Sequence, residues 1–466
     1  MERQHPIIIV TAFLDELKSL ALPIILSFIV QVGSRESFGL SRGYVIFMSV
    51  LLGFMLLYGF LRWLFFKYDY DEAALVIKQG IFIKKNRTIK KERIQSFNTE
   101  AGILLRLFNL VTLNIETAAN TQEPEFNLKA LKIKKAESIM KTLKTDKKDV
   151  DTEEQPLNTI KTTLSTKQLF LAGITSGSVG IIFGFLSVVA SQGFVFLPDQ
   201  AIDWIINSIV ASSIVGIITI GSLVFMLAWL ISIIRYVIRF AFFTIEKEDD
   251  TLFITRGLIV KKTFSIKLNR IQALIIDEGL LRQPFKLATI QAEVAGGSKY
   301  EESFRISLMP IIHKTWIDDF IKQYISDYNL EISHKVLPKR ALKRYLIRSN
   351  AVLLLMVPLL YISMYFLWGI LFIIPLTILG FYRYKDGAYT INEKYFILRS
   401  RIISKRTFYA LKPHVQSFEL TKTIFQRYRK LFTTNINVLS AAGKSTFTLK
   451  DIDEEEFLTF LTWFNR

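Results

Sequence analysis

The sequence contains no cysteine, which excludes disulfide bonds, thiolate metal ligands, thiol nucleophiles and cysteine-attached lipids. Histidine is almost as scarce. The four residues His5, His313, His334 and His414 are isolated, and no two have the spacing of metal ligands. Motifs of serine hydrolases, zinc proteases and dinucleotide enzymes are absent from the sequence as well. We therefore expect a protein that is not an enzyme and that uses no cofactor and no metal.

Charged residues are rare in several long apolar runs, and a helix needs about 20 apolar residues to cross a bilayer. The runs form pairs: Leu17–Val32 with Tyr44–Phe66, Leu169–Leu197 with Ile202–Ile234, and the single stretch Leu346–Phe381. This last stretch is long for one span and tight for two, so a single span and a hairpin turning near Trp368-Gly369 both stay open. Symmetry with the other pairs favours the hairpin and predicts about six transmembrane helices.

Basic residues gather outside the paired runs. The turn of the second pair contains Asp199 and Asp203 but neither lysine nor arginine. Because cytoplasmic loops carry an excess of Lys and Arg, we expect a multi-pass cell-membrane protein with cytoplasmic termini and large domains. The formal net charge of +18 then points to the anionic lipids of the cytoplasmic leaflet. Nucleic acid is not expected, because no aromatic residues are interleaved along a basic groove.

Three polar segments with alternating β patterning separate and follow the apolar pairs. In the first, Leu75–Ile77 and Ile81–Ile83 predict a hairpin that turns at Gln79-Gly80. In the second, Leu252–Ile254 and Leu258–Val260 predict the same hairpin around Arg256-Gly257. Each segment ends in an amphipathic helical pattern, and the three patterns are Lys129–Leu143, Pro310–Ile325 and Asp453–Phe464. Asp453 and Glu456 are also spaced as a capping box.

These segments are copies of one repeat. Gly80 is followed 13 positions later by Arg93-Ile94-Gln95, and Gly257 is followed 13 positions later by Arg270-Ile271-Gln272. In the third copy Arg401 takes the glycine position and His414 the arginine position. Arg106, Arg282 and Arg429 each precede an alanine by 13 positions. We expect the glycines to supply positive φ, and we favour a structural role for the repeated arginines and for Gln95, Gln272 and Gln416.

With these motifs the chain resembles the bacterial pleckstrin-homology-like (PH-like) domain of YdbT-type membrane proteins, with three repeats. The resemblance implies an α+β membrane protein in which helix pairs alternate with bent β domains, each closed by a C-terminal helix. The expected division is transmembrane pair 1 at 1–66, PH-like domain 1 at 67–147, a linker at 148–166, transmembrane pair 2 at 167–238, PH-like domain 2 at 239–330, a linker with transmembrane pair 3 at 331–382, and PH-like domain 3 at 383–466.

Basic residues cluster after the first strands of each repeat. Because the spans tether the domains to the leaflet, contact with anionic headgroups is one interpretation, and solubilising charge screened by salt is the other. The candidate headgroup contacts are Lys84, Lys85, Arg87, Lys261, Lys262, Lys405 and Arg406. The segment Ala442-Gly443-Lys444-Ser445 suggests a phosphate loop, but Val438 stands where the motif needs glycine. We expect a β-turn there.

The function predicted from the sequence is that of a non-enzymatic membrane protein with cytoplasmic PH-like interaction domains. The resemblance adds a role in resistance or immunity to membrane-active antimicrobial peptides. It also implies a smaller one-domain membrane companion, and a peptide ligand is a further expectation. Two alternatives stay open: export of a peptide or lipid, and scaffolding of an envelope complex.

Overall fold

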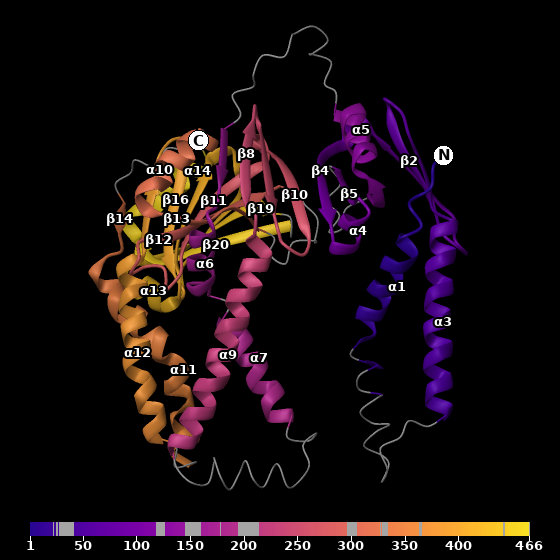
Figure 1. Ribbon diagram of the computed structural model, residues 1–466. Helices are drawn as coiled ribbons and strands as arrows, with labels where there is room; N and C mark the ends of the chain where they lie inside the picture. The colour runs from indigo at the N-terminus through magenta and orange to yellow at the C-terminus, as the bar shows by residue number, and fades with distance from the viewer. Residues whose placement is uncertain are drawn as a thin grey trace. The chain divides into compact units, whose positions relative to one another are not determined.

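The computed structural model describes residues 1–21, 23, 24, 27, 42–117, 126–144, 160–177, 179–193, 214–295, 305–326, 328, 334–362, 366–440 and 443–465. The chain divides into two compact units. Unit 1 consists of Met1–Leu157 with Ile259–Ser265, and unit 2 consists of Asn158–Leu258 with Ile266–Arg466. Within each unit, helix pairs extend from β domains, and each β domain is one repeat of the sequence (Figure 1).

Unit 1 contains the first helix pair and the β domain of repeat 1. The helices of the pair are α1 (Ile8–Ser19) and α3 (Arg42–Leu64). The β domain is built from β1 (Lys67–Tyr70), β2 (Ala74–Gln79), β3 (Lys85–Lys90), β4 (Ile94–Ala101), α4 (Ile103–Leu107), β5 (Leu110–Thr117), β6 (Phe126–Lys132) and the closing helix α5 (Ile133–Lys144). Residues 261–265, the first part of β10 (Lys261–Lys267), also belong to this unit because β10 pairs with β4.

Unit 2 contains the other two helix pairs and repeats 2 and 3. The second pair and repeat 2 comprise β7 (Ile160–Thr163), α6 (Thr166–Ile174), α7 (Val179–Gly193), α9 (Ile214–Phe240), β8 (Thr244–Glu248), β9 (Thr251–Arg256), the end of β10, β11 (Ile271–Glu278), β12 (Leu287–Val294), β13 (Arg305–His313) and α10 (Ile317–Tyr324). The third pair and repeat 3 comprise β14 (Lys335–Val336), α11 (Leu342–Ile362), α12 (Phe366–Asp386), β15 (Ala388–Ile391), β16 (Tyr395–Arg401), β17 (Lys405–Leu411), β18 (Val415–Thr421), α13 (Ile424–Tyr428), β19 (Leu431–Ser440), β20 (Gly443–Asp453) and α14 (Phe457–Asn465).

Antiparallel three-stranded sheets are the building block of the repeats. Repeat 1 has the orders β1-β2-β3 and β6-β5-β4, and repeat 3 has β15-β16-β17 and β18-β19-β20. The alternation of apolar residues along these strands turns one face inward. In repeat 1, Leu75, Leu113 and Ile139 of the closing helix are fully buried in one core. In unit 2 the strands β11 and β17 pair, so one continuous sheet joins repeats 2 and 3.

The helix pairs begin and end on the same side of their β domains. Residues just before each pair bond to the first strand after it: Glu2 bridges Tyr68, β7 pairs with β8, and β14 pairs with β15. In each case the chain therefore leaves the β domain and returns to it at the same place. The same topology therefore occurs three times. The predicted linker at 148–166 contains β7, and the segment 331–382, predicted as a linker with transmembrane pair 3, contains β14.

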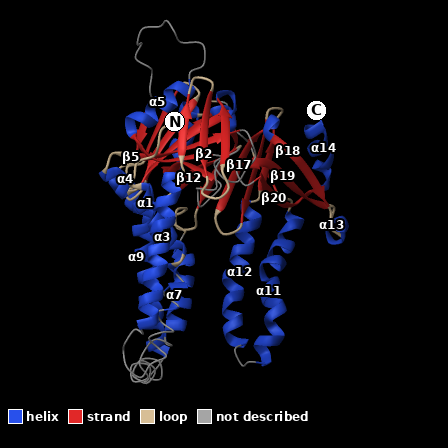
Figure 2. Cartoon of the chain, turned by 90° about the vertical axis from the view of Figure 1, so that its right-hand side faces the viewer, coloured by secondary structure: helices blue, strands red, loops and turns tan. Residues whose placement is uncertain are grey.

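The third apolar run forms a helical hairpin rather than one long helix. Asn350 Nδ2 of α11 donates to Thr377 Oγ1 of α12 over 3.0 Å, and Arg383 Nη1 donates to Ser349 Oγ over 3.2 Å. Figure 2 shows α11 and α12 side by side below the sheets. Helix α11 ends at Ile362 and α12 begins at Phe366, so Trp368 and Gly369 lie in α12 and the turn predicted near them is wrong.

Within the described residues, two helices are long and apolar enough to cross a membrane, Arg42–Leu64 and Ile218–Phe240. The bent pair α6 and α7 adds a third if it forms one span. The six predicted spans thus stay a prediction. Half of Leu17–Val32 and the turn at Pro198-Asp199 lie outside the described residues.

The closing helices start later than predicted. Lys129 lies in β6 and Pro310 in β13, so α5 begins at Ile133 and α10 at Ile317. Asp453 is the last residue of β20, and its side chain accepts from Glu455 N over 3.2 Å, so the predicted capping box with Glu456 is wrong. Strand pairing continues into these segments and outweighs their helical periodicity.

The hairpin glycines have the predicted backbone conformation, with φ of +118° at Gly80 and +109° at Gly257. The predicted second strands are wrong, however. Ile81–Ile83 and Leu258–Val260 are loop residues, and the next strands begin at Lys85 and Lys261. The chain turns over more residues than a two-residue hairpin. Position 80 needs glycine, because a Cβ there would lie 1.9 Å from the Ile83 carbonyl oxygen.

Gly80→Ala is expected to lower the free energy of unfolding of unit 1 by on the order of 1 kcal/mol or more, since alanine is strained at this φ. Gly102→Ala is the matched control. Gly102 has φ of −69°, and a Cβ there meets no atom within 4 Å. Denaturant midpoints of the two variants in neutral detergent measure the difference. Equal midpoints would contradict a conformational requirement at Gly80.

Candidate functional site

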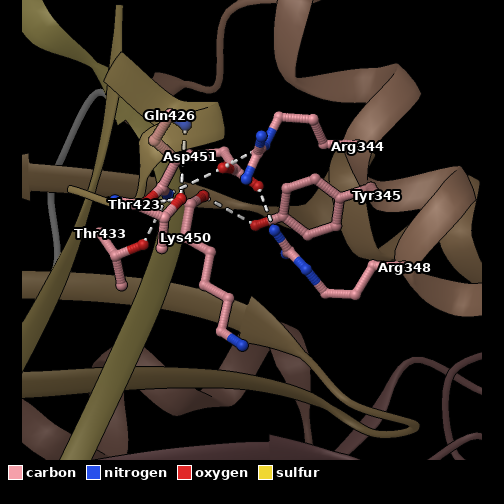
Figure 3. A network of polar contacts seen from close by, with 8 residues as sticks. All are labelled: Arg344, Tyr345, Arg348, Thr423, Gln426, Thr433, Lys450 and Asp451. Atoms are coloured by element: carbon pink, nitrogen blue, oxygen red, sulfur yellow. Dashed lines mark hydrogen bonds and ion pairs between the residues drawn. The ribbon is translucent and has the colours of Figure 1, made fainter. Parts of the chain in front are cut away.

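A buried carboxylate joins helix α11 to repeat 3. Asp451 of β20 is fully buried and accepts Arg344 Nε over 2.8 Å and Arg348 Nη2 over 2.7 Å (Figure 3). Gln426 Nε2 also donates to Asp451, over 2.9 Å. Tyr345 lies between the two arginines and donates to the carbonyl of Lys450 over 2.9 Å. The first turns of α11 are thus tied to the β domain by charge-assisted hydrogen bonds.

The same joint occurs in the other repeats with different chemistry. Ala130 of β6 and Ile311 of β13 both lie two residues before the end of the strand, as Asp451 does. Ala130 packs against Ile8 of α1, and Ile311 packs against Ala172 of α6. Repeat 3 therefore has an ionic joint where repeats 1 and 2 have apolar ones. This joint was not predicted from the sequence, although a carboxylate between the apolar residues Leu449 and Ile452 of a strand is a signal of a buried ion pair.

A basic cavity of about 410 Å³ opens beside this joint, between α11, α12 and the sheet that joins repeats 2 and 3. Its cations are five arginines and one lysine, and no carboxylate is among the lining residues. The cations are Arg305, Arg348, Arg383, Arg401, Arg406 and Lys450. Tyr345, Phe408 and Phe447 provide an aromatic wall, and Arg305 lies over the Phe447 ring at 5.4 Å. We call this the basic cavity.

Carboxylates outside the cavity position four of these cations. Asp451 holds Arg348, Asp386 holds Arg401, Asp277 holds Arg406, and Glu293 holds Arg305. Arg383 instead donates to two neutral acceptors, the carbonyl of Ile402 and the hydroxyl of Ser349. Within the described residues neither Arg383 nor Lys450 has a carboxylate partner. The basic cavity is therefore rigidly lined and keeps a positive excess.

More arginines lie in this part of unit 2. A second cavity of about 750 Å³ is lined by Arg235 and Arg239 of α9, and it shares Arg406 with the basic cavity. His334 lies nearby in repeat 3, and its Nδ1 is 3.0 Å from Thr390 Oγ1. Burial, together with the positive charges of Arg399 and Lys405, lowers the pKa of His334. That direction is the one expected for an imidazole held among cations.

The predicted headgroup contacts fall into two groups. Lys84, Lys85, Arg87 and Lys261 are exposed. The other three form ion pairs across strand joints: Lys262 with Glu100 over 2.9 Å, Lys405 with Glu278 over 3.2 Å, and Arg406 with Asp277 over 2.9 Å. Of the seven predicted residues, only Arg406 lines the basic cavity. Headgroup contact by the exposed residues stays a prediction.

The repeated arginines are not equivalent in space. Arg270 donates from Nε and Nη2 to the Ala295 carbonyl, and Gln272 donates to the Arg270 carbonyl. Arg282 is buried, and it donates to the carbonyls of Pro310 and Ala172. The remaining signature residues are not buried: Arg93, Arg106, Gln416 and Arg429 are exposed, and Gln95 is half-buried.

Backbone geometry corrects the predicted alignment. Asn109, Lys286 and Lys430 all have positive φ immediately before the next strand. When the repeats are aligned on these three residues, Arg282 is equivalent to Leu105 and Gln426. Arg106 is then equivalent to Gln283 and Arg427. The predicted match of Arg106, Arg282 and Arg429 with one another is therefore wrong.

Arg401 is the other departure of the third repeat. It does not have positive φ, because it ends β16 and pairs with Lys405 before the loop begins. Gly443, Lys444 and Ser445 lie in β20, so the β-turn expected at 442–445 is wrong for these three residues, and Ala442 lies outside the described residues. A strand there is not the loop that begins a helix in a phosphate-binding motif.

Comparison with known proteins accounts for the threefold architecture. The model of the bacterial PH domain family matches the chain three times, over residues 19–147, 183–323 and 351–466. The chain belongs to the bacterial PH domain family. It is also similar to the transmembrane protein YdbT of Bacillus subtilis (strain 168), with 31% identity over 494 residues that cover 100% of this chain and 98% of the relative. No solved structure matches the chain. Repeats 1, 2 and 3 are thus PH domains 1, 2 and 3 of a YdbT-type membrane protein.

Proposed function

We propose that this protein is a non-enzymatic, multi-pass membrane protein whose PH domains 2 and 3 hold the phosphate of an acidic lipid headgroup at the cytoplasmic leaflet. The observation that carries the proposal is the basic cavity, with six cations and no carboxylate among its lining residues. Arginine guanidinium groups match phosphate geometry with two parallel hydrogen bonds. Such a lining suits a phosphodiester better than a neutral ligand.

The place of the basic cavity favours a lipid over a soluble anion. Tyr345, Arg348 and Ser349 of α11 and Arg383 of α12 lie at the ends of the predicted third span pair, where lipid headgroups would be. The half-buried ring of Phe447, which stacks on the buried Phe408 ring at 3.7 Å, offers an apolar surface to the glycerol and first acyl carbons. A cytoplasmic orientation follows from the positive-inside rule and is part of the proposal.

The test compares lipid binding by the intact chain and by the double variant Arg383→Gln with Lys450→Gln. These two cations have no carboxylate partner among the described residues, so removing them leaves no buried acid alone. Each contact contributes about 1 kcal/mol near a headgroup, so we expect dioctanoyl phosphatidylglycerol to bind about tenfold or more weakly. Calorimetric titration in neutral detergent measures the change.

The control removes two exposed lysines of unit 2 instead, Lys267→Gln with Lys322→Gln. An equal loss in both double variants would mean that the chain attracts the lipid only by its net charge, which contradicts the proposal. Titration with glycerol 3-phosphate separates the sources of the anion. Tighter binding of the soluble phosphate than of the lipid would assign the basic cavity to a soluble ligand.

Protection against membrane-active peptides is the physiological role we propose from the family resemblance. Deletion of the gene is expected to sensitise the cell to one or more bacteriocins, and reintroduction of the gene to restore resistance. Unchanged sensitivity across a panel would count against this role. Export predicts peptide or lipid flux in vesicles that contain only this protein. Scaffolding predicts stoichiometric co-purifying partners, of which a one-domain membrane companion is the expected candidate.

A further inference from the structure

The loop that follows the second strand of each PH domain exposes large apolar side chains. In PH domain 1, Phe82 and Ile83 are 96% and 74% exposed. In PH domain 3, Ile402 and Ile403 are 67% and 57% exposed, and Leu258 of PH domain 2 is exposed as well. Such side chains are costly in water at three equivalent positions, and repeated exposure of this kind marks a contact surface.

A second loop in each PH domain has the same character. It carries α4 in PH domain 1, residues 280–286 in PH domain 2 and α13 in PH domain 3. Leu107 of α4 is 75% exposed, and Ile424 and Phe425 of α13 are 82% and 76% exposed. Leu280, Leu281 and Phe285 are exposed at the matching place in PH domain 2. Each PH domain therefore presents two apolar loops.

The first loop lies beside the end of the preceding membrane helix in every domain. In PH domain 1, Lys67 pairs with Lys78, so the loop after Gln79 lies next to the strand that starts three residues beyond α3. In PH domain 2, Leu258 N donates to the Ile238 carbonyl of α9 over 2.9 Å. In PH domain 3, Arg383 Nε of α12 donates to the Ile402 carbonyl over 2.9 Å.

The second loop lies at the same end of each domain. Leu105 of α4 packs with Ile8 and Trp63 of the first helix pair. Arg282 Nη2 reaches the Ala172 carbonyl of α6 over 3.3 Å. Arg340, just before α11, donates to the Lys430 carbonyl over 3.1 Å. Both apolar loops therefore lie where the helices leave their domain.

We propose that these paired loops insert their apolar tips into the interfacial layer of the bilayer, so that each PH domain lies on the membrane surface. The occupant is the lipid surface, because the loops continue from the ends of the helix pairs, two of which contain helices long and apolar enough to span. Lysines directly follow the first loop in all three domains: Lys84 and Lys85 in PH domain 1, Lys261 and Lys262 in PH domain 2, and Lys405 in PH domain 3. Apolar tips flanked by cations are the composition of segments that bind at an anionic interface.

Spin labelling tests this proposal directly. The chain has no cysteine, so a nitroxide can be attached to a single introduced cysteine in each variant. The full chain carries Phe82→Cys, Ile403→Cys or Phe425→Cys in nanodiscs of phosphatidylcholine and phosphatidylglycerol. We expect the nitroxide at each loop site to collide several-fold more often with oxygen, relative to a nickel chelate, than the control sites do. Ile424→Cys gives a second reading of the α13 loop.

The controls are Glu72→Cys and Glu393→Cys, exposed residues in the turns at the opposite ends of the same hairpins. Nitroxides at these control sites are expected to collide with the nickel chelate as readily as a label in water does. Loop sites that match these controls would overturn the proposal. So would loop sites shielded from both oxygen and nickel, because that pattern means burial against protein, such as a second copy or a partner. Ile402 lines the basic cavity and its carbonyl accepts from Arg383, whereas Phe82 and Phe425 lie outside the cavity lining. The labels at Phe82 and Phe425 therefore report insertion independently of the lipid titration.

Discussion

Asp451→Asn is expected to lower the free energy of unfolding of PH domain 3 by about 3 kcal/mol. Removing one partner of a buried ion pair costs about 3–5 kcal/mol, because the remaining charges stay without compensation. Asp451 is fully buried and serves two guanidinium groups at once. Arg344 and Arg348 have side-chain exposures of 21% and 35%, so water relieves part of the cost, and the lower end of the range applies.

The matched control is Asp453→Asn, two residues along the same strand. Asp453 pairs with Arg340, but both side chains are partly exposed, so a loss below about 1 kcal/mol is expected. Hydrogen–deuterium exchange of β19 and β20, with denaturant midpoints in detergent, measures both variants. Equal midpoints would contradict the ionic joint.

An apolar rebuild provides a further check on that joint. The triple variant Asp451→Ala, Arg344→Met and Arg348→Met imitates the apolar joint of PH domain 1, in which alanine occupies the position of Asp451. The backbone has the same conformation at both positions, with φ of 53° at Ala130 and 62° at Asp451. Well-packed apolar residues often replace a buried ion pair without loss of stability. The triple variant should therefore be more stable than Asp451→Asn, and a lower midpoint would contradict this reading.

Local patterns were enough to predict the repeated architecture. The spacing of Gly80 and Gly257 predicted both the repeat and the positive φ that the structure shows. Charge symmetry favoured a hairpin over Leu346–Phe381, and the contacts between Asn350 and Thr377 confirm it. These features are short-range or repeated within the chain, so one sequence carries enough information for them.

The basic cavity could not be predicted in the same way. Its cations come from β13, α11, α12, β16, β17 and β20, which are far apart in the sequence. The pairing of β11 with β17 brings these elements together. The sequence showed the positive charge, but only the partner carboxylates decide which cations are neutralised. Lys262 and Lys405 were predicted as headgroup contacts because they lie in basic clusters of the sequence. In the structure, strand pairing brings them into ion pairs with Glu100 and Glu278.

The strands predicted from apolar residues at the two loops were also wrong, for a physical reason. Ile81–Ile83 looks like a strand because three apolar residues follow a turn, and short apolar runs do not distinguish strands from exposed tips. The alignment of Arg106 with Arg282 failed because 13 positions separate Arg93 from Arg106, whereas 12 separate Arg270 from Arg282. One residue of offset moves a side chain from the surface to the interior of this turn.

Arg282→Leu is expected to lower the free energy of unfolding of PH domain 2 by about 3 kcal/mol, because hydrogen bonds to a charged group are worth about 1.5–3 kcal/mol and buried acceptors lose their donor. Leucine fits the space, since Leu105 occupies the equivalent position. The Pro310 carbonyl keeps donors from Tyr236 and Thr289, so most of the loss falls on the Ala172 carbonyl of α6.

Arg282→Leu thus tests whether this arginine attaches the second helix pair to its domain. Lys322→Leu removes the same charge from an exposed position of α10, and it should leave the denaturant midpoint nearly unchanged. Hydrogen exchange adds a readout that general destabilisation would not give, because amides of α6 should exchange faster while those of α14 in PH domain 3 keep their rates. Uniformly faster exchange across PH domains 2 and 3 would instead assign Arg282 to the shared sheet and remove it from the helix joint.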